Sequence, residues 1–415
     1  MADTVATSSN EPACAPDHAA RRISIGFINF AHALDHYVIL IFPTVVIGLE
    51  AVYGRSYAEL IALGTASFVA FGIFSLPAGW LADRWSRRNM MALFYFGCGV
   101  SLLGAALAPN LIALAVALAA LGMFAAIYHP VGTAMLIEQA TTRGRSLAFN
   151  GVCGNLGVAL AAGITAVLAS LTGWRGAFVV PAAVCILTGL AYLRLVPDDR
   201  HTSVARDKTP DVRLAAWIAA TVFGLFIVIA LTAGLVFHIV TVALPKIVDE
   251  RLGDVPLILV GGLATVIFVF GALAQLAMGR LVEKFPLHIL FAAVALWQFA
   301  GVLWAAYATG VTILFALAVA IIGIYGQVTV NDMVIARYTA DAWRGRVFAV
   351  RYFLTFVVSG AAVSLIALLH GRGGFDLVLA ATAVIALGFV VATAAIAVLV
   401  NSVEKERASV PQPAE

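Results

Sequence analysis

Charged side chains are scarce in this 415-residue chain. Asp, Glu, Lys and Arg together make up 11% of the residues, whereas soluble domains carry about 25%. Hydrophobic residues make up 62%, and a water-soluble protein of this length needs far more charge to cover its surface. The composition therefore excludes a soluble globular protein. The net charge of +3 comes from short basic clusters between apolar blocks, so we expect no nucleic-acid binding.

Motifs for ATP hydrolysis and metal binding are also missing. The chain has no Gly-rich loop followed by Lys and Ser or Thr, so it encodes no ATP motor. The four cysteines show no paired spacing, and three of them lie inside apolar blocks, which is typical of packing residues. His32 and His36 have a metal-compatible spacing of four residues but lack obvious further ligands. We therefore expect no metal and no cofactor.

Apolar blocks of about 20 or more residues fill most of the chain. Twelve of them can be marked between residues 23 and 400, each long enough to cross a hydrocarbon layer of about 30 Å. Backbone groups in lipid must be satisfied within their own segment, and the blocks are too continuously apolar for the alternating strands of a barrel. The sequence therefore predicts an all-α membrane protein with twelve transmembrane helices in a lipid bilayer.

The basic residues predict the orientation of these helices. If both termini are cytoplasmic, the inner segments hold 19 of the 25 Lys and Arg residues. The outer loops then hold only five, and Arg351 falls within an apolar block. This asymmetry favours cytoplasmic termini and an even number of helices.

Three landmarks repeat in the two halves of the chain. HYVILIFP from His36 matches HIVTVALP from His238, GWLADRW from Gly79 matches GRLVEKF from Gly279, and TTRGRSLAFN from Thr141 matches AWRGRVFAVR from Ala342. The offsets are nearly constant, which indicates two homologous six-helix halves. The expected division is a disordered cytoplasmic tail at 1–22, a six-helix bundle at 23–195, a cytoplasmic linker at 196–213, a second bundle at 214–400 and a cytoplasmic tail at 401–415.

The segment GWLADRWSRR, residues 79–88, resembles the signature loop of the major facilitator superfamily, with Ser86 where a second Gly is usual. The resemblance implies two pseudo-symmetric six-helix bundles, a substrate site at the midplane between them, and transport by rocking of the halves. Finer features look like the bacterial fosmidomycin-resistance branch. They are His32 and Asp35, the triplet Tyr128-His129-Pro130, and the run Gly154-Asn155-Leu156-Gly157.

Polar groups inside apolar blocks are costly in lipid and are candidates for function. His32, Asp35 and His36 lie within five residues, and helical geometry places the two histidines on one face beside Asp35. A carboxylate and imidazoles that exchange protons near neutral pH would form a proton-coupling site. The alternative is a hydrogen-bond network that only fixes helix packing.

Two further histidines extend this candidate site. His129 precedes Pro130, whose missing N–H predicts a kink in the helix expected at 111–136. His129 could line the substrate cavity, or only hydrogen-bond a carbonyl that the kink frees. His238 is the repeat partner of His36, which favours a cavity role over that of a lone core histidine.

Asp332 and Arg351 are ionisable residues inside the second half. We expect an ion pair between them, because neither is stable alone in lipid, and Asn331 precedes the carboxylate. The pair could be structural. Alternatively, Arg351 could bind an anionic group of the substrate.

The signature loop and the fifth apolar block predict a gate and a packing face. The loop residues should hold the two halves closed on the cytoplasmic side, the alternative being a solvated loop. They are Gly79, Asp83, Arg84, Arg87 and Arg88. Small residues allow close helix contact, so Gly154, Asn155 and Gly157 are expected in helix packing.

The residues, together with the family that the chain resembles, predict a monomeric secondary transporter of a small organic solute in a bacterial inner membrane. Proton antiport and efflux are preferred, and uptake of a small organic anion is the alternative. A membrane-embedded enzyme would need catalytic residues clustered at one membrane face, whereas the buried groups are dispersed over both halves. A sensor would not need the buried Asp35 and Asp332.

Overall fold

A computed structural model describes residues 18–197, 216–253, 255–338 and 341–409, and every regular element in these ranges is helical. The first half contains α1 (His18–Tyr53), α2 (Tyr57–Ile61), the 3-10 helix η1 (Ala62–Gly64), α3 (Thr65–Arg84), α4 (Arg87–Ala106), α5 (Leu111–Ala125), α6 (Tyr128–Gln139) and α7 (Arg143–Leu195). The second half contains α8 (Ala216–Leu252), α9 (Leu257–Leu281), α10 (Leu287–Tyr307), α11 (Thr312–Tyr338) and α12 (Asp341–Ser409).

Ten helical segments among the described residues are long and apolar enough to cross a membrane. Two of them contain two crossings each, because α7 has 53 residues and α12 has 69, far more than the ~20 that one crossing needs. Gly173 interrupts α7 and Gly374 interrupts α12, both in the left-handed region with φ of 76° and 59°. Ten segments plus these two extra crossings give the twelve that the sequence predicts.

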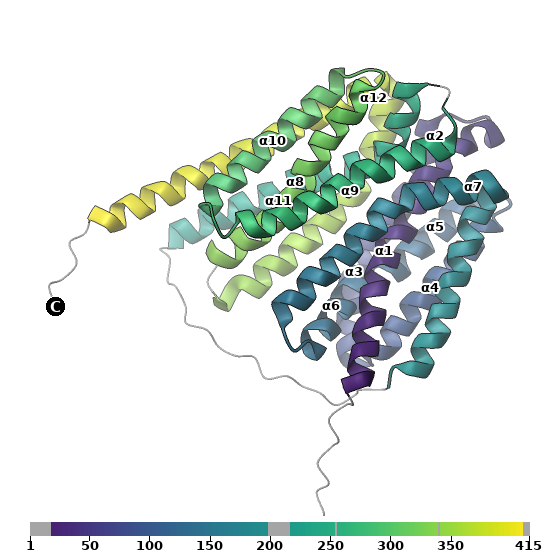
Figure 1. Cartoon of the computed structure of the whole chain (residues 1–415), viewed down its shortest axis with the longest axis horizontal. Helices are drawn as coiled ribbons and strands as arrows, with labels where there is room; N and C mark the ends of the chain where they lie inside the picture. Colours follow the sequence, from purple (N-terminus) through teal and green to yellow (C-terminus); the bar gives the residue numbers. More distant parts are fainter. Residues whose placement is uncertain (1–17, 198–215, 254, 339–340, 410–415) are drawn as a thin grey trace, which may run out of the picture.

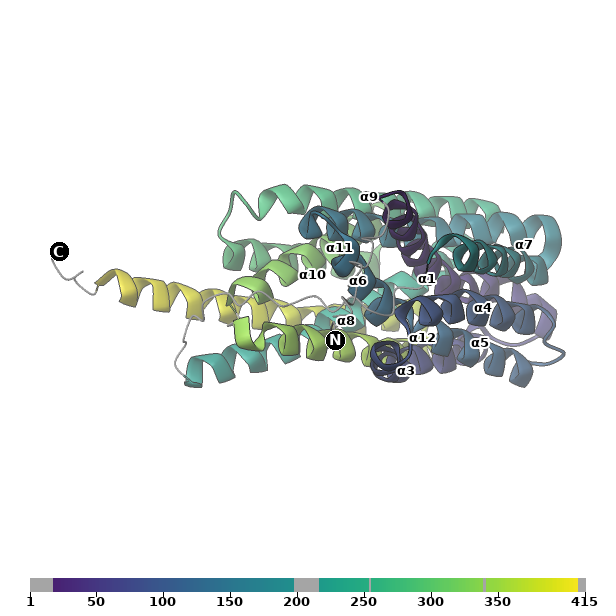
Figure 2. The ribbon, with the colours of Figure 1, turned by 90° about the horizontal axis from the view of Figure 1, so that it is seen from below.

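The two halves lie side by side (Figures 1 and 2). We call the end of the molecule where α1 turns into α2 the Gly54 end, and the opposite end, where α1 begins, the His18 end. Helices of the two halves run together at the Gly54 end and diverge toward the His18 end (Figure 1). Across the boundary, α3 packs against α12 and α7 against α9.

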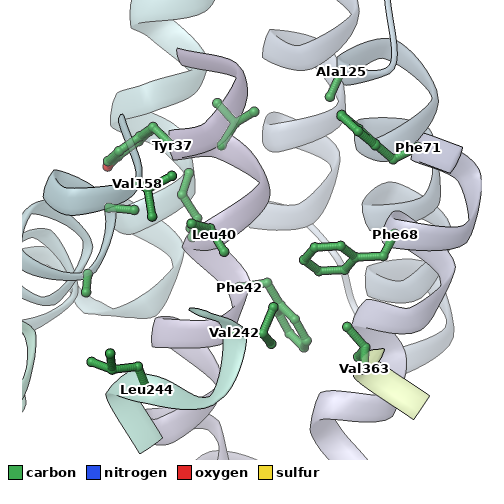
Figure 3. Packing of buried hydrophobic residues seen from close by; sticks show 14 of the residues in the cluster. Tyr37, Leu40, Phe42, Phe68, Phe71, Ala125, Val158, Val242, Leu244 and Val363 are labelled. Atoms are coloured by element: carbon green, nitrogen blue, oxygen red, sulfur yellow. The ribbon is translucent and has the colours of Figure 1, made fainter. Parts of the chain in front are cut away.

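Buried apolar side chains fill the boundary between the halves. Phe42 of α1 and Phe68 of α3 meet Val242 of α8 and Val363 of α12 there (Figure 3). Glycine allows the backbones of α3 and α12 to approach closely. A Cβ on Gly72 would lie 2.9 Å from the carbonyl oxygen of Phe356, closer than real side chains allow.

Helix boundaries differ from the expected ones at both termini. The described part of α1 begins at His18, inside the segment expected as a tail, and α12 continues to Ser409, inside the other expected tail. Arg is a good helix former, so the helix continues through Arg21 and Arg22. Residues 1–17, 410–415 and most of the expected linker lie outside the described residues.

Candidate functional site

Three histidines from two helices meet inside the first half. His32 and His36 lie one turn apart on α1, and His129 lies in the first turn of α6. The ring centroids are 5.0 Å apart for His32 and His36, and 5.4 Å apart from each of these to His129. We call these three side chains the histidine cluster. The expectation that His32 and His36 lack further metal-ligand neighbours is therefore wrong, because the fold brings a third imidazole to them.

Pro130 explains why His129 can reach α1. The helix expected at 111–136 is broken: α5 ends at Ala125 and α6 begins at Tyr128. Proline is tolerated in the first turn of a helix but not in its interior. The break places Pro130 in the first turn of α6, where its missing N–H costs little. The predicted kink is confirmed as this break.

Asp35 lies beside the cluster and is only 1% exposed. Its Oδ2 is 3.3 Å from Nε2 of His129, within ion-pair distance. Among the described residues, neither of its carboxylate oxygens has a hydrogen-bond partner of good geometry. A buried carboxylate without hydrogen-bond partners is costly unless it is protonated or lies beside a positive charge, so the contact of Asp35 with His129 is a candidate proton-binding site.

Asn150 of α7 holds the other side of the cluster. Its backbone oxygen lies 2.8 Å from Nδ1 of His32, and since a carbonyl can only accept, this nitrogen carries the hydrogen. The Asn150 side chain hydrogen-bonds Tyr128 at 2.9 Å and Asn29 at 2.9 Å. The packing network considered as an alternative is thus present for His32, whereas Asp35 lies outside it.

Residues of the second half reach this site. Phe356 of α12 packs against His129 with ring centroids 5.0 Å apart, and Phe71 of α3 lies 6.0 Å from the same ring. His238 of α8 is near enough to His36 for electrostatic interaction and hydrogen-bonds the backbone of Thr355. The histidine cluster therefore faces the boundary between the halves.

The expected ion pair between Asp332 of α11 and Arg351 of α12 is present. Asn331, beside it on α11, is buried, and its side-chain oxygen has no hydrogen-bond partner among the described residues. The repeat aligns Arg351 with Asn150, and each of these residues ties its helix to the preceding one in its half. A structural role for the pair is therefore supported, and a role in binding substrate stays a prediction.

The signature loop is held by contacts within the first half. Arg87 donates to Asp83 at 2.8 Å and to Glu138 of α6 at 2.9 Å. Arg88 donates to the carbonyl oxygens of Leu193 and Val196, both at 2.6 Å. The contact with Glu138 was not predicted from the sequence. Glu138 belongs to no motif and lies just beyond the helix expected at 111–136.

Gly79 and Arg84 of the signature loop also make their contacts within the first half. A Cβ on Gly79 would lie 3.2 Å from Cβ of Pro130, so glycine allows α3 to pass close to α6. Arg84 lies over the ring of Trp80, 4.0 Å from its centroid. A gate that closes across the two halves is not formed by these contacts in the described arrangement, and it stays a prediction.

Gly154 and Gly157 lie where α7 crosses α1. A Cβ on Gly157 would be 2.1 Å from the carbonyl oxygen of Ala33, and one on Gly154 would be 2.6 Å from Nε2 of His32. Asn155 donates to Gln275 of α9, across the boundary between the halves. The two glycines thus allow close packing, whereas Asn155 connects the halves.

An ion cluster at the Gly54 end was not anticipated from the sequence. Lys246 of α8 is 6% exposed and pairs with Glu50 of α1 from the other half. It also lies 2.9 Å from Asp249 and 3.7 Å from Glu250, whose carboxylate contacts His370 of α12 at 2.9 Å. We call Glu50, Lys246, Asp249, Glu250 and His370 the Gly54-end ion cluster. From the sequence, Lys246 is one of the five basic residues counted in the outer loops. Its position beside Pro245, still within an apolar block, was the feature that pointed to burial.

Comparisons with known proteins agree with this architecture. The family model described as Major Facilitator Superfamily matches residues 25–271. A bacterial homologue of the human lysosomal transporter Spinster, solved in an inward-facing and unoccupied conformation, has a TM-score of 0.73 at 15% identity, covering 92% of this chain and 95% of that one. A D-xylose-proton symporter has a TM-score of 0.71 at 14% identity, covering 90% and 96%. These likenesses show the fold.

Similar curated proteins match over shorter stretches. The probable L-galactonate transporter of Escherichia coli K12 is 26% identical over 153 residues, which is 36% of this chain and 34% of that protein. The puromycin resistance protein pur8 of Streptomyces alboniger is 35% identical over 145 residues, 34% of this chain and 28% of that protein. The matches thus span about a third of these relatives.

Proposed function

From the premise that this chain belongs to the major facilitator superfamily, we propose that it is a proton-coupled antiporter exporting a small organic solute. The protein is a multi-pass membrane protein and a secondary transporter, not an enzyme. The proposed setting is a bacterial inner membrane, with the protein acting as a monomer and with the His18 end in the cytoplasm.

The contact between Asp35 and His129 carries the proposal. A proton bound to this pair neutralises the buried carboxylate of Asp35. When the proton leaves, the carboxylate is negatively charged, and the imidazole of His129 is the contacting group that can balance this charge. Phe356 of the second half packs on the same imidazole, so movement of the halves changes the surroundings of the pair. Proton binding and the position of the halves are thereby coupled through His129.

Alternating access follows from where the ion pairs lie. Glu50 and Lys246 join the halves at the Gly54 end, whereas at the His18 end the contacts of Arg87 with other described residues stay within the first half. This is the arrangement that a transporter open toward the His18 end would have. We propose that rocking breaks the Gly54-end ion cluster and brings the signature loop, through Asp83 and Arg88, against the second half.

The substrate is proposed to be amphipathic. Phe71 and Phe356 give the site apolar walls beside titratable imidazoles, which suits a cationic or neutral amphipathic molecule that exchanges for protons. Uptake of a small organic anion is the second candidate, favoured by the likeness to the probable L-galactonate transporter. Against it, Arg351 is already neutralised by Asp332.

Flux in proteoliposomes tests the proposal. The purified protein would be reconstituted with a pH-sensitive dye inside, and puromycin and L-galactonate would be used as probes under imposed pH gradients. A proton-coupled exporter should move a probe against the proton flow, and a protonophore should remove the effect. Flux of a transported probe that is indifferent to the pH gradient would overturn proton coupling.

Orientation gives a separate prediction. A reporter enzyme fused within residues 196–213 should be active only as a cytoplasmic reporter, because this segment holds Arg200, Arg206, Lys208 and Arg213, and Arg194 lies just before it. Paired fusions of alkaline phosphatase and green fluorescent protein at the same position measure this directly, and fusions between Gly253 and Pro256 are the control for the opposite side. Phosphatase activity at 196–213 would reverse the proposed orientation.

A further inference from the structure

The three imidazoles of the histidine cluster lie in ring contact with one another. We infer that His32, His36 and His129 together bind a divalent transition-metal cation of the Zn²⁺ class, each through one ring nitrogen. The inference goes beyond the proposed function and does not depend on it, since it concerns binding alone.

The spacing of the rings fits a metal ion after a small adjustment. One nitrogen from each ring can be chosen so that all three lie within 4.8 Å of one another. In a tetrahedral zinc site with bonds of 2.0–2.1 Å, ligand nitrogens are about 3.3 Å apart. Movements of roughly 1 Å, within the reach of side-chain rotation, would therefore complete the site. All three side chains are half-buried, so an ion can reach them.

Neighbouring groups prepare the rings for coordination. The Asn150 carbonyl holds the hydrogen on Nδ1 of His32, which leaves Nε2 as the nitrogen with a lone pair for a metal. Such a carbonyl or carboxylate partner accompanies nearly every metal-binding histidine and fixes its tautomer. The Asn150 side chain is itself anchored by Tyr128 and Asn29, so this support is rigid.

Asp35 supplies the charge that a dication needs in an apolar setting. It is buried, its oxygens lack good hydrogen bonds among the described residues, and it lies 3.3 Å from His129. This buried carboxylate is independent of the histidine spacing, and a cation bound beside it would be stabilised by its charge. Three imidazoles with one carboxylate favour Zn²⁺, Co²⁺, Ni²⁺ or Cu²⁺ over Mg²⁺ or Ca²⁺, which prefer sites made of oxygen.

Cobalt spectroscopy tests the inference without any transport assay. The full chain would be purified in detergent without a polyhistidine tag and titrated with Co²⁺, then with Zn²⁺ as competitor. We expect the visible absorption bands of tetrahedral Co²⁺ at one ion per chain, and their loss when Zn²⁺ is added. His36→Gln and His129→Gln should each weaken binding by at least about tenfold. His288→Gln is the matched control, because His288 is also buried but contacts Asn401 in the second half.

Absence of the bands in the parent protein would overturn the inference, as would unchanged binding in both variants. If the variants do not accumulate, the parent protein still gives the answer through chemical modification. Bound Zn²⁺ should protect His32, His36 and His129 from diethylpyrocarbonate, and equal modification with and without Zn²⁺ would contradict the site. Neither readout uses solute flux. A failure to bind metal would therefore not contradict the proposed proton coupling, and flux that is indifferent to the pH gradient would not contradict the metal site.

Discussion

Replacement of Asp35 by Asn is expected to abolish transport driven by a pH gradient, to the level of protein-free vesicles. Asn has the size of Asp but cannot release or bind a proton near neutral pH, so the pair with His129 loses its titrating carboxylate. The mutant should still fold, because removing the charge of a buried carboxylate without hydrogen-bond partners lowers the cost of burial. Driven flux in proteoliposomes is the measurement.

Two controls separate coupling from structure in this experiment. Exchange of labelled for unlabelled solute needs no net proton movement, so Asp35→Asn should retain it. Asp35→Glu keeps a titratable carboxyl and should retain part of the driven flux. Normal driven flux by a well-expressed Asp35→Asn protein would falsify the proposed role, and it would identify the contact with His129 as packing.

Lys246→Met is expected to open the Gly54 end. Lys246 is the buried cation among three carboxylates, and its loss leaves Glu50, Asp249 and Glu250 close together without it. Breaking a buried ion pair costs about 3–5 kcal/mol, and the partial exposure of these carboxylates reduces this to roughly 1–3 kcal/mol. Because about 1.4 kcal/mol is a factor of ten, the ratio of open to closed molecules should rise roughly fivefold to a hundredfold.

Labelling of a buried cysteine measures this opening. Val363 of α12 is fully buried next to Phe42, so Val363→Cys in a chain without its native cysteines should react with an impermeant maleimide only when the Gly54 end opens. Asp376→Asn is the matched control, because Asp376 pairs with Arg251 but is largely exposed, and exposed pairs contribute little. Asp83→Asn, which weakens the proposed gate at the His18 end, should not raise labelling. Equal labelling rates of Lys246→Met and its parent would contradict the proposal that the Gly54-end ion cluster holds this end closed.

The fold was predictable because membrane insertion leaves few choices. A block of about 20 apolar residues must form a helix in lipid, so the twelve crossings and the two halves follow from the sequence. The helix ends were less predictable, as α1 and α12 show, since polar residues continue a helix past the membrane without any break in propensity.

The pair of Asp332 and Arg351 was predictable across two helices, because lone charges in lipid need partners, but in the histidine cluster only the contacts along α1 were predictable. The period of 3.6 residues puts His32 and His36 on one face beside Asp35, and the sequence showed this grouping. Contact with His129 depends on how α6 crosses α1, which no local pattern encodes. The same holds for the pair of Glu50 and Lys246, which are separated by nearly half the chain.

The close contact of α3 with α12 at Gly72 can act as a fulcrum. Gly72 lies about 18 Å along α3 from Arg84 at the His18 end, taking 1.5 Å per residue. A tilt of about 10° around this point would move that end by ~3 Å, enough to make or break a hydrogen bond, which tolerates only a few tenths of an ångström. Thr65, at the other end of α3 and about 11 Å from Gly72, would move the other way by ~2 Å. If the halves rock about this glycine contact, opening at the Gly54 end is accompanied by closing at the His18 end, so the proposed path across the membrane opens to one side at a time.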